Sequence, residues 1–245
     1  MMKTKPYSGA YSALGGIFEY LNDDCGYEQW SQYLIEKLRG AGKRGVDVGC
    51  GNGYFTRALY KAGYDVKGID ISPQMLSTAV ELARKESVSA EFLLGDIAKL
   101  SLNFKADFIT AVNDCINYVA PKDITSAFSR VNKCLKKGGT FIFDISSPHK
   151  LQHILGDNLF AEDRGDIAYM WFNKLFCDRV EMDITVFTKQ EGGSFLRADE
   201  QHTQYIYTEE QLKELLESAG FEVQTEGHLG GDKNQRINFI CKKYE

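Results

Sequence analysis

From about residue 44 onward, short apolar segments of strand length alternate with amphipathic segments whose hydrophobic residues repeat at helical spacing. The pattern predicts five strands, at residues 44–49, 64–70, 90–95, 105–113 and 140–146. It predicts three helices between them, at residues 53–62, 73–86 and 122–135. Ser72 and Pro73 suit the N-cap and the first position of the second helix. Strands that alternate with helices predict a parallel sheet covered on both faces, and therefore an α/β fold.

The rhythm changes after Pro148. Within residues 166–207, apolar and polar residues alternate one by one, most clearly at 180–186, which is the spacing of half-buried strands. Turn signals at 177–178 and 191–194 divide this stretch into three strands. We therefore expect an antiparallel β-meander inserted late in the main sheet.

The last part of the chain returns to the earlier pattern. Thr208 and Gln211 have the spacing of a capping box for a helix at 208–219. Two strands follow, at 221–228 and 235–243, and the short glycine-rich turn between them predicts an antiparallel hairpin. The domain organisation expected from these patterns is an N-terminal helical lid at 1–43, a core at 44–150 and 205–245, and an inserted β cap at 151–204.

Composition and charge narrow the class of protein. Of 245 residues, 43% are hydrophobic and 26% are charged, as in ordinary globular domains. The six cysteines include no Cys-x-x-Cys pair and none has zinc-ligand spacing to a histidine, so we expect free thiols and no metal. The net charge of −5 disfavours nucleic acid as a partner. No signal peptide or bilayer-length apolar run is visible, which predicts a cytoplasmic protein without a membrane partner.

A glycine-rich segment follows the first predicted strand and opens the first predicted helix. Gly49, Gly51 and Gly53 let the backbone turn tightly and let a ligand approach the main chain, where helix N-terminal amides face it. Asp70 ends the second strand about twenty positions later, which is the spacing of a ribose-binding carboxylate. Tyr54 occupies the place of the third glycine in a dinucleotide motif, so the spacing departs from that of an NAD site.

Five short segments stand at or near the ends of predicted strands: 47–53 (DVGCGNG), 68–75 (GIDISPQM), 95–97 (GDI), 112–114 (VND) and 135–139 (LKKGG). Together they resemble the motifs of class I S-adenosylmethionine-dependent methyltransferases of the small-molecule type. The resemblance covers about residues 44–147 and the final helix and hairpin. It implies a Rossmann-like, seven-stranded, mostly parallel sheet with an antiparallel last strand, and S-adenosylmethionine as the cofactor.

The resemblance also implies residue roles. The glycine loop lies against the methionine portion of the cofactor, Asp47 supports its ammonium group, and Asp70 binds the ribose. Asp96 accepts a hydrogen bond from the adenine amino group, beside the amide of Ile97. The full predicted cofactor set is Tyr7, Asp47, Gly49, Gly51, Gly53, Asp70, Ile71, Met75, Asp96, Ile97 and Asn113. Each residue also has an ordinary structural role open to it, such as a turn, a helix cap or core packing.

Methyl transfer mainly requires alignment of the reactants and exclusion of water, and it needs a general base only if the nucleophile must lose a proton. The candidates for such a base are His202, Asp144, Tyr7 and Tyr11. Of these, His202 on the third insert strand and Tyr11 in the N-terminal segment are the predicted catalytic residues. A histidine with only a structural role is the alternative for His202.

Aromatic residues in the insert and the N-terminal segment have two explanations. Tyr169, Trp171 and Phe172 either pack the insert onto the core or line an acceptor pocket. The N-terminal aromatics either cover the sheet as helices or form a mobile lid. The insert resembles that of small-molecule N-methyltransferases of the glycine/sarcosine type, but no signature fixes that substrate. We expect a small-molecule acceptor with a nitrogen or oxygen nucleophile, and a monomer or homodimer.

Three other functions are compatible with parts of the sequence. An NAD-dependent oxidoreductase would explain the glycines and Asp70, but not the glycine spacing or Asp96. A non-catalytic S-adenosylmethionine-binding protein would keep every cofactor motif and lack only the acceptor chemistry. A purely structural interaction protein would bind neither cofactor.

Overall fold

The computed structural model describes residues 25–244. Residues 1–24 and 245 lie outside the described part, and with them the predicted site residues Tyr7 and Tyr11.

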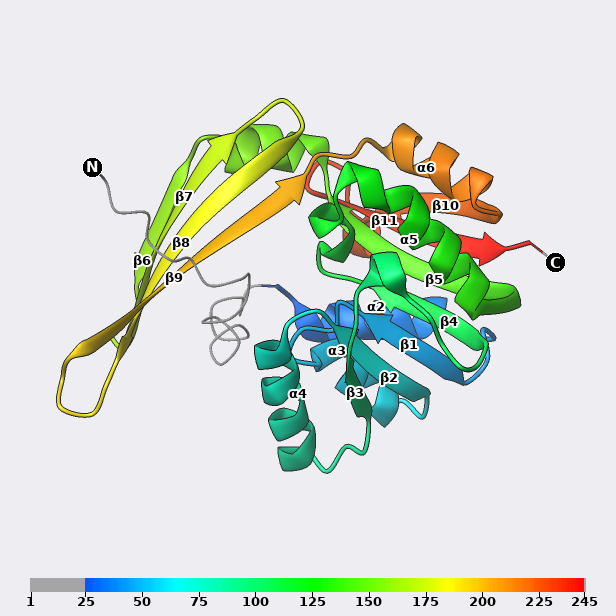
Figure 1. Ribbon diagram of the computed structural model, residues 1–245, viewed down its shortest axis with the longest axis horizontal. Coiled ribbons are helices and arrows are strands. Elements are labelled where there is room, and N and C mark those ends of the chain that lie inside the picture. The colour runs from blue at the N-terminus through cyan, green and yellow to red at the C-terminus, as the bar shows by residue number, and fades with distance from the viewer. Residues whose placement is uncertain (1–24, 245) are drawn as a thin grey trace.

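The centre of the protein is a seven-stranded sheet with the order β10-β11-β5-β4-β1-β2-β3 (Figure 1). Its strands are β1 (Arg44–Val48), β2 (Asp65–Asp70), β3 (Glu91–Leu94), β4 (Ala106–Ala111), β5 (Leu135–Ser146), β10 (Phe221–Gly227) and β11 (Arg236–Lys243). β1 to β5 pair in parallel, whereas β11 is antiparallel to both β5 and β10. The predicted α/β fold with an antiparallel last strand is confirmed.

Within residues 25–244, one helix precedes β1, and four helices and several short helical turns connect the strands. The helices are α2 (Tyr27–Lys37), α3 (Tyr54–Lys61), α4 (Pro73–Lys85), α5 (Pro121–Cys134) and α6 (Glu209–Ser218). The 3-10 turns are η1 (Ile97–Lys99), η2 (Cys115–Tyr118) and η4 (His228–Gly230). The Ser72 side chain caps α4 and Thr208 with Gln211 forms the capping box of α6, as predicted. No helix within residues 25–244 is long and apolar enough to cross a membrane.

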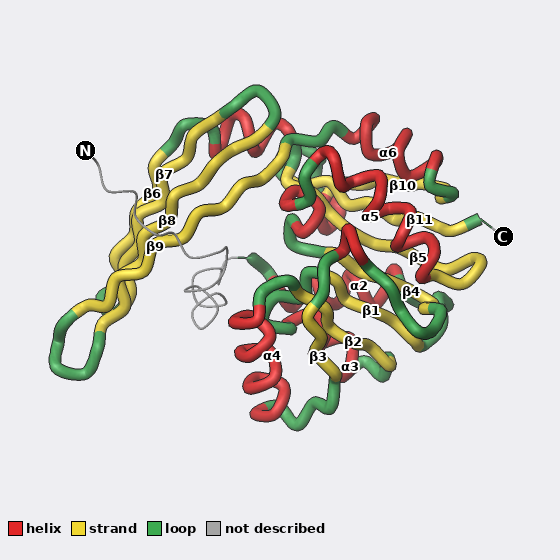
Figure 2. Tube along the Cα trace, in the orientation of Figure 1, coloured by secondary structure: helices red, strands yellow, loops and turns green. Residues whose placement is uncertain are grey.

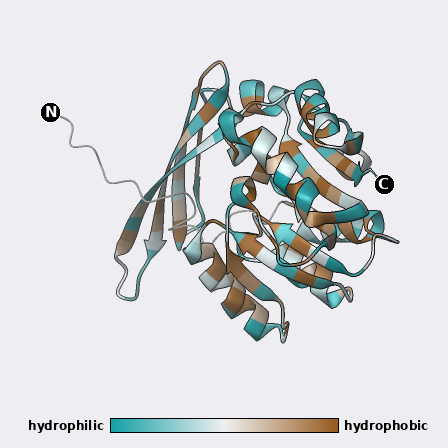
Figure 3. Ribbon diagram, turned by 45° about the vertical axis from the view of Figure 1, so that its right-hand side comes forward, coloured by the Kyte–Doolittle hydropathy of each residue, from teal (hydrophilic) through white to brown (hydrophobic). Residues whose placement is uncertain are grey.

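Hydrophobic residues run along the strands of the central sheet, and helices cover both of its faces (Figure 3). On one face, α5 and α6 bury residues such as Phe128 and Leu212 against β4, β5 and β11. On the other face, α2 and α3 pack Trp30, Leu34 and Phe55 against the sheet. The described part of the N-terminal region therefore covers the sheet, with its apolar stripe turned inward.

The insert is a separate four-stranded antiparallel sheet that extends away from the core as a long ribbon (Figures 1 and 2). It begins with a π-helical segment, η3 (Lys150–Leu155), and its strands are β6 (Leu159–Asp163), β7 (Ile167–Leu175), β8 (Arg179–Lys189) and β9 (Phe195–Tyr205). The sequence predicted three strands, so β6 was missed. β6 is a short edge strand that pairs only with β7 and is largely exposed, so it lacks the alternation that marks a half-buried strand.

The register of the insert determines which side chains share a face. Directly opposed residues of an antiparallel pair point to the same side of the sheet. His202 on β9 lies opposite Met182 on β8, and Trp171 on β7 lies opposite Ile184. On this face Met182 packs against Leu151 of η3, and His202 faces Tyr118 of the core.

Candidate active site

The glycine loop between β1 and α3 has a backbone that only glycine adopts without strain. Gly49, Gly51 and Gly53 have φ values of 69°, 55° and 80°, all in the left-handed region. A β-carbon on Gly49 would stand 2.4 Å from the Cys115 sulfur, and one on Gly53 would stand 2.6 Å from the Phe92 ring. Both the conformation and the close approach of neighbouring side chains therefore require these glycines.

Asp70 at the end of β2 is bound to the glycine loop. Its Oδ2 accepts a hydrogen bond from the Gly51 amide at 2.7 Å, and its Oδ1 accepts one from the Ser72 amide at 2.8 Å. The residue is only 8% exposed, and burial raises the pKa of its carboxyl. Each carboxylate oxygen can accept more than one hydrogen bond, so Asp70 can bind a hydroxyl-bearing ligand while it holds the loop.

A cavity opens beside the glycine loop, and six of the predicted cofactor residues line it: Gly49, Gly51, Asp70, Ile71, Met75 and Asn113. Ile71 is 70% exposed, which is unusual for an isoleucine and suits a residue that a flat apolar group covers. The aromatic part of the lining is Tyr27, Tyr54, Phe55 and Tyr118. Of these, the sequence raised only Tyr27, as one of the N-terminal aromatics of a possible lid.

Four further predicted cofactor residues stand close to this cavity without lining it. Asp47 lies beneath the loop, where its carboxylate accepts hydrogen bonds from the Thr56 and Thr110 hydroxyls. Gly53 begins α3 as its N-cap. Asp96 accepts a hydrogen bond from the Ala98 amide and so caps η1, in which Ile97 is buried. Their contacts with a cofactor stay predictions.

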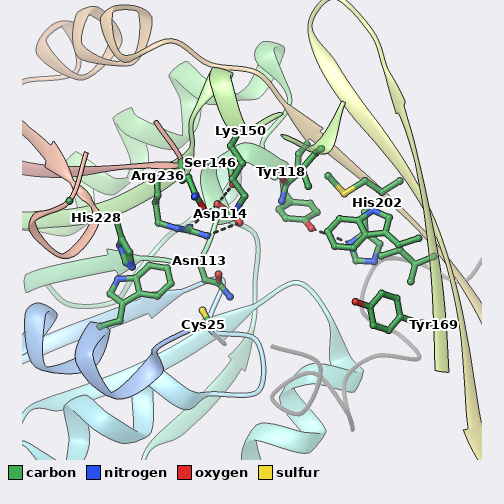
Figure 4. Close-up of a pocket in the computed structure, with 18 of the residues that line it drawn as sticks. Cys25, Asn113, Asp114, Tyr118, Ser146, Lys150, Tyr169, His202, His228 and Arg236 are labelled. Atoms are coloured by element: carbon green, nitrogen blue, oxygen red, sulfur yellow. Dashed lines mark hydrogen bonds and ion pairs between the residues drawn. The ribbon is translucent and has the colours of Figure 1, made fainter. Parts of the chain in front are cut away.

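A second and larger cavity, of about 690 Å³, lies between the core and the inner face of the insert (Figure 4). The insert contributes aromatic, aliphatic and polar side chains to it: Tyr169, Trp171, Met182, Ile184, His202 and Gln204. The core contributes Trp30, Asn113, Asp114, Tyr118, Ser146 and Arg236, among others. The predicted insert residues His202 and Trp171 therefore face the core together, whereas Phe172 lies on the opposite, outer face of the insert.

His202 is buried at the edge of this cavity with two polar partners. Its Nε2 lies 2.8 Å from the Glu200 carboxylate and its Nδ1 lies 3.2 Å from the Tyr118 hydroxyl. His202 and Glu200 are 3% and 1% exposed. Figure 4 shows the Tyr118 ring reaching toward His202 from the core side. The sequence identified His202, but no local pattern pointed to Tyr118.

Arg236 at the start of β11 binds the Asp114 carboxylate in the cavity wall (Figure 4), and it also binds the Asp144 carboxylate of β5. Its guanidinium binds both oxygens of Asp114, at 2.8 and 3.2 Å, and also contacts Asp144. Burial opposes ionisation of Asp114, but the Arg236 charge holds its pKa below the usual range, while burial keeps the pKa of Asp144 raised. The Asp144 carboxylate also accepts a hydrogen bond from the Asn113 amide at 2.6 Å. Asp144 was a candidate base in the sequence. In the structure its carboxylate binds the backbone at the end of β4.

The two cavities have two lining residues in common, Asn113 and Tyr118. Both follow β4, and Asn113 adopts φ 63°, a left-handed conformation that is costly for a residue other than glycine. The Asn113 and Asp114 amides donate hydrogen bonds to the Asp144 carboxylate, and these bonds hold the backbone in this conformation. The strained turn therefore lies where the two cavities meet.

Comparison with known proteins agrees with this architecture. Residues 46–139 match the family model described as a methyltransferase domain. A protein of Geobacillus sp. (strain WCH70) that is named as a methyltransferase is 30% identical over 245 residues, covering 95% of this chain and 99% of its own. An S-adenosylmethionine-dependent methyltransferase from Clostridium acetobutylicum ATCC 824 has a similar structure, with a TM-score of 0.86, 30% identity, and coverage of 94% of this chain and 96% of its own.

A more distant structure has the same fold with a cofactor bound. It is that of the S-adenosylmethionine-bound amino pentose methyltransferase CalS10 from Micromonospora echinaspora. Its TM-score is 0.74 at 16% identity, with 99% of this chain and 100% of that chain covered. Together with the glycine loop, the Asp70 carboxylate and the relatives that match almost the whole chain, this fold shows that the protein belongs to the class I S-adenosylmethionine-dependent methyltransferases.

Proposed function

We propose that the enzyme transfers the methyl group of S-adenosylmethionine to a nitrogen or oxygen atom of a small molecule held between the core and the insert. The observation that carries this proposal is the junction of the two cavities at Asn113 and Tyr118. One cavity lies at the cofactor motifs and the other is lined by the insert. A group can pass from an occupant of the first to an occupant of the second at this junction.

The residues of the smaller cavity fit S-adenosylmethionine. Asp70 has the remaining hydrogen-bonding capacity to accept ribose hydroxyls, and the absence of a side chain at Gly49 and Gly51 leaves the backbone accessible. The exposed side chain of Ile71 and the buried Met75 offer apolar contacts to an adenine ring. When it is bound, the cofactor supplies an already activated methyl group.

The larger cavity has the size and lining of a small-molecule site. About 690 Å³ lies within the roughly 300–1,000 Å³ of typical ligand pockets. Two buried polar atoms in its lining, the Trp171 indole nitrogen and the Gln204 side-chain oxygen, have no hydrogen-bond partner among residues 25–244. A buried donor and a buried acceptor without partners in residues that line a cavity favour an acceptor molecule with its own polar groups, since unsatisfied groups are costly.

We further propose that the insert acts as the cap of the acceptor site, with His202 as a catalytic residue. The inner face of the insert forms one wall of the cavity, and such a wall excludes water from the reacting atoms. The methylation of an amino pentose by the similarly folded CalS10 makes amino sugars the first acceptor class to test. Phenols are the second class, because the aromatic lining suits a ring.

The test uses a property of this cavity: both tryptophans of the chain, Trp30 and Trp171, line it. Amino sugars and phenols are screened for transfer of a labelled methyl group, and binding is followed by tryptophan fluorescence in Trp30→Phe and Trp171→Phe variants. A true acceptor receives label and changes the fluorescence of Trp171. Label transfer to an acceptor that leaves Trp171 unperturbed would contradict the proposed site.

The role of the insert is tested by replacing residues 159–204 with a short Gly/Ser linker. The shortened protein should still bind S-adenosylmethionine and should lose methyl transfer. Circular dichroism and cofactor titration check its folding. In the full chain, the point variant Gln204→Leu removes a polar group from the insert side of the cavity. It should likewise keep cofactor binding and lose methyl transfer. Near-parental turnover of a folded, shortened protein would contradict the cap assignment.

A further inference from the structure

Three side chains form a hydrogen-bonded chain that leads from the junction of the two cavities into the insert. The Tyr118 hydroxyl lies 3.2 Å from His202 Nδ1, and His202 Nε2 lies 2.8 Å from Glu200 Oε2. Tyr118 comes from η2 of the core, whereas His202 and Glu200 are both on β9. Tyr118 is the member that lines both cavities, so it is the one in reach of the reacting atoms.

The hydrogen-bonding capacities of the three groups give the chain a direction. An ionised carboxylate can only accept, so the Glu200 oxygen requires a hydrogen on His202 Nε2. A neutral imidazole then has its lone pair on Nδ1, which accepts a hydrogen bond from the Tyr118 hydroxyl. The assignment leaves the Tyr118 oxygen as an acceptor toward the cavity, where a protonated nucleophile can donate to it.

We propose that Tyr118, His202 and Glu200 form a proton relay that removes the proton of the acceptor's nucleophile. This proposal rests on the proposed function, since it describes chemistry at the same site. Tyr118 and His202, which both line the larger cavity, are the catalytic residues: Tyr118 contacts the nucleophile and His202 receives the proton. Glu200 is a positioning residue that stabilises the imidazolium. The relay implies an acceptor whose nucleophile, such as a hydroxyl or an ammonium group, must lose a proton before or as it attacks the methyl group.

The step balances in protons and electrons. The nucleophile's proton moves to the Tyr118 oxygen as the Tyr118 proton moves to His202 Nδ1, so the tyrosine is neutral before and after. The nucleophile's electron pair forms the new bond to the methyl carbon, and the electron pair of the broken carbon–sulfur bond remains on sulfur. His202 carries the positive charge next to the Glu200 carboxylate until the proton returns to water.

Three other ionisable groups at or next to the cavity wall, Asp114, Asp144 and His228, are poorly suited to this task. Asp114 and Asp144 are bound by the Arg236 guanidinium and by backbone amides or a serine hydroxyl. His228 packs edge-on against Trp30, with 4.5 Å between ring centroids, and burial and the Arg236 charge lower its pKa to about 4. A group that binds a proton so weakly is a poor base at neutral pH.

The relay is tested with two pairs of probe acceptors that differ in their need for a base. Phenol and benzylamine are largely protonated at their nucleophile in mildly alkaline buffer, whereas 4-nitrophenol is largely an anion and aniline is a neutral amine. Methyl transfer to each probe is measured for the wild type and for Tyr118→Phe, His202→Gln and Glu200→Gln. Loss of general-base catalysis is expected to slow transfer to phenol and benzylamine by about a hundredfold or more. Transfer to 4-nitrophenol and aniline should fall by less than about tenfold.

The matched control is Met182→Leu, which changes an apolar neighbour directly opposite His202 in the register. This variant should change the rate of methyl transfer by the same factor for both members of each probe pair, because it alters packing and leaves the relay residues in place. Equal losses for the two members of a pair in the Tyr118→Phe and His202→Gln variants would overturn the relay and leave a structural role.

A second measurement tests the direction of the chain without any turnover. The ring nitrogens of ¹⁵N-labelled histidine show which nitrogen carries hydrogen, and the His202→Gln variant assigns the His202 signals. The relay requires hydrogen on Nε2 and no hydrogen on Nδ1, with the Nδ1 signal moving in Tyr118→Phe. Hydrogen on Nδ1 of neutral His202 would overturn the proposal. The acceptor screen on the wild type tests the proposed function separately, so the two can fail independently.

Discussion

The Asp70 carboxylate accepts a hydrogen bond from the Gly51 amide at 2.7 Å, so the residue predicted to bind the ribose also holds the glycine loop. Asp70→Ala should therefore weaken S-adenosylmethionine binding by at least tenfold, since hydrogen bonds to a charged group contribute about 1.5–3 kcal/mol each. Because the loop loses its anchor, the variant should also unfold at a lower temperature. Calorimetry and thermal denaturation measure the two effects.

Ser72→Ala is the matched control for Asp70. Ser72 caps α4 next to Asp70, so its removal should lower stability by about 1 kcal/mol and leave cofactor affinity nearly unchanged. An Asp70→Ala protein that is folded and binds the cofactor as tightly as the wild type would refute the ribose assignment.

Gly49→Ala should destabilise the protein and abolish cofactor binding, because the new β-carbon would meet the Cys115 sulfur at 2.4 Å in a left-handed backbone. Gly165→Ala is the control: Gly165 has a similar φ of 82°, but a β-carbon there would meet no atom within 4 Å. Its loss of stability therefore measures backbone strain alone. Chemical denaturation should show a larger loss of the free energy of unfolding for Gly49→Ala than for Gly165→Ala. Adding Cys115→Ala to Gly49→Ala should recover part of the difference, and no recovery would mean that the contact is unimportant.

Asp96→Ala tests adenine recognition. If Asp96 accepts a hydrogen bond from the adenine amino group, the variant should bind S-adenosylhomocysteine more weakly and should bind the inosine analogue, which lacks that donor, with a much smaller penalty. Because Asp96 also caps η1 through the Ala98 amide, a modest loss of stability accompanies the change. Equal losses of affinity for the two ligands would show that Asp96 does not contact the base.

Asp47 makes the stability of the protein depend on pH. Burial raises the pKa of its carboxyl from 3.8 to about 6, despite the hydrogen bonds from Thr56 and Thr110. The folded protein thus holds this proton more tightly than the unfolded chain does, and the resulting stability is present below about pH 4 and lost as the pH rises through about 6. The loss amounts to about 3 kcal/mol. Urea denaturation of Asp47→Asn should lack this component.

Asp65→Asn, an exposed change on the neighbouring strand β2, is the control for Asp47. It should leave the pH dependence of the free energy of unfolding as it is in the wild type. If Asp47→Asn and the wild type lose stability in parallel between pH 4 and 7, the buried carboxyl is not the cause.

Arg236→Met should cost about 3–5 kcal/mol of stability, because it leaves two buried carboxylates without their cation. Arg179→Met is the matched control, since the Arg179 side chain is 30% exposed and its pairs with Asp178 and Glu181 are near the surface. Surface pairs contribute at most about 1 kcal/mol. Urea midpoints that coincide for the two variants would contradict the structural role of Arg236.

Much of the fold was readable from the sequence because its signals are local. The cap at Ser72, the capping box at Thr208 and the glycine loop depend on residues within a few positions of each other, and all three form as predicted. Alternation along β8 also revealed the half-buried insert, since one face of that strand is buried against η3. β6 escaped prediction because an exposed edge strand has no such constraint.

The sequence by itself determined the cavity at the glycine loop: a glycine loop after one strand and a carboxylate at the end of the next must meet at the same edge of a parallel sheet. Only the tertiary structure decided the larger cavity between the core and the insert. Tyr118 and His202 are 84 residues apart, and Arg236 and Asp114 are 122 apart. Whether such side chains meet depends on strand register and on how the insert packs against the core. No local propensity encodes that packing, because it results from the burial of many side chains at once.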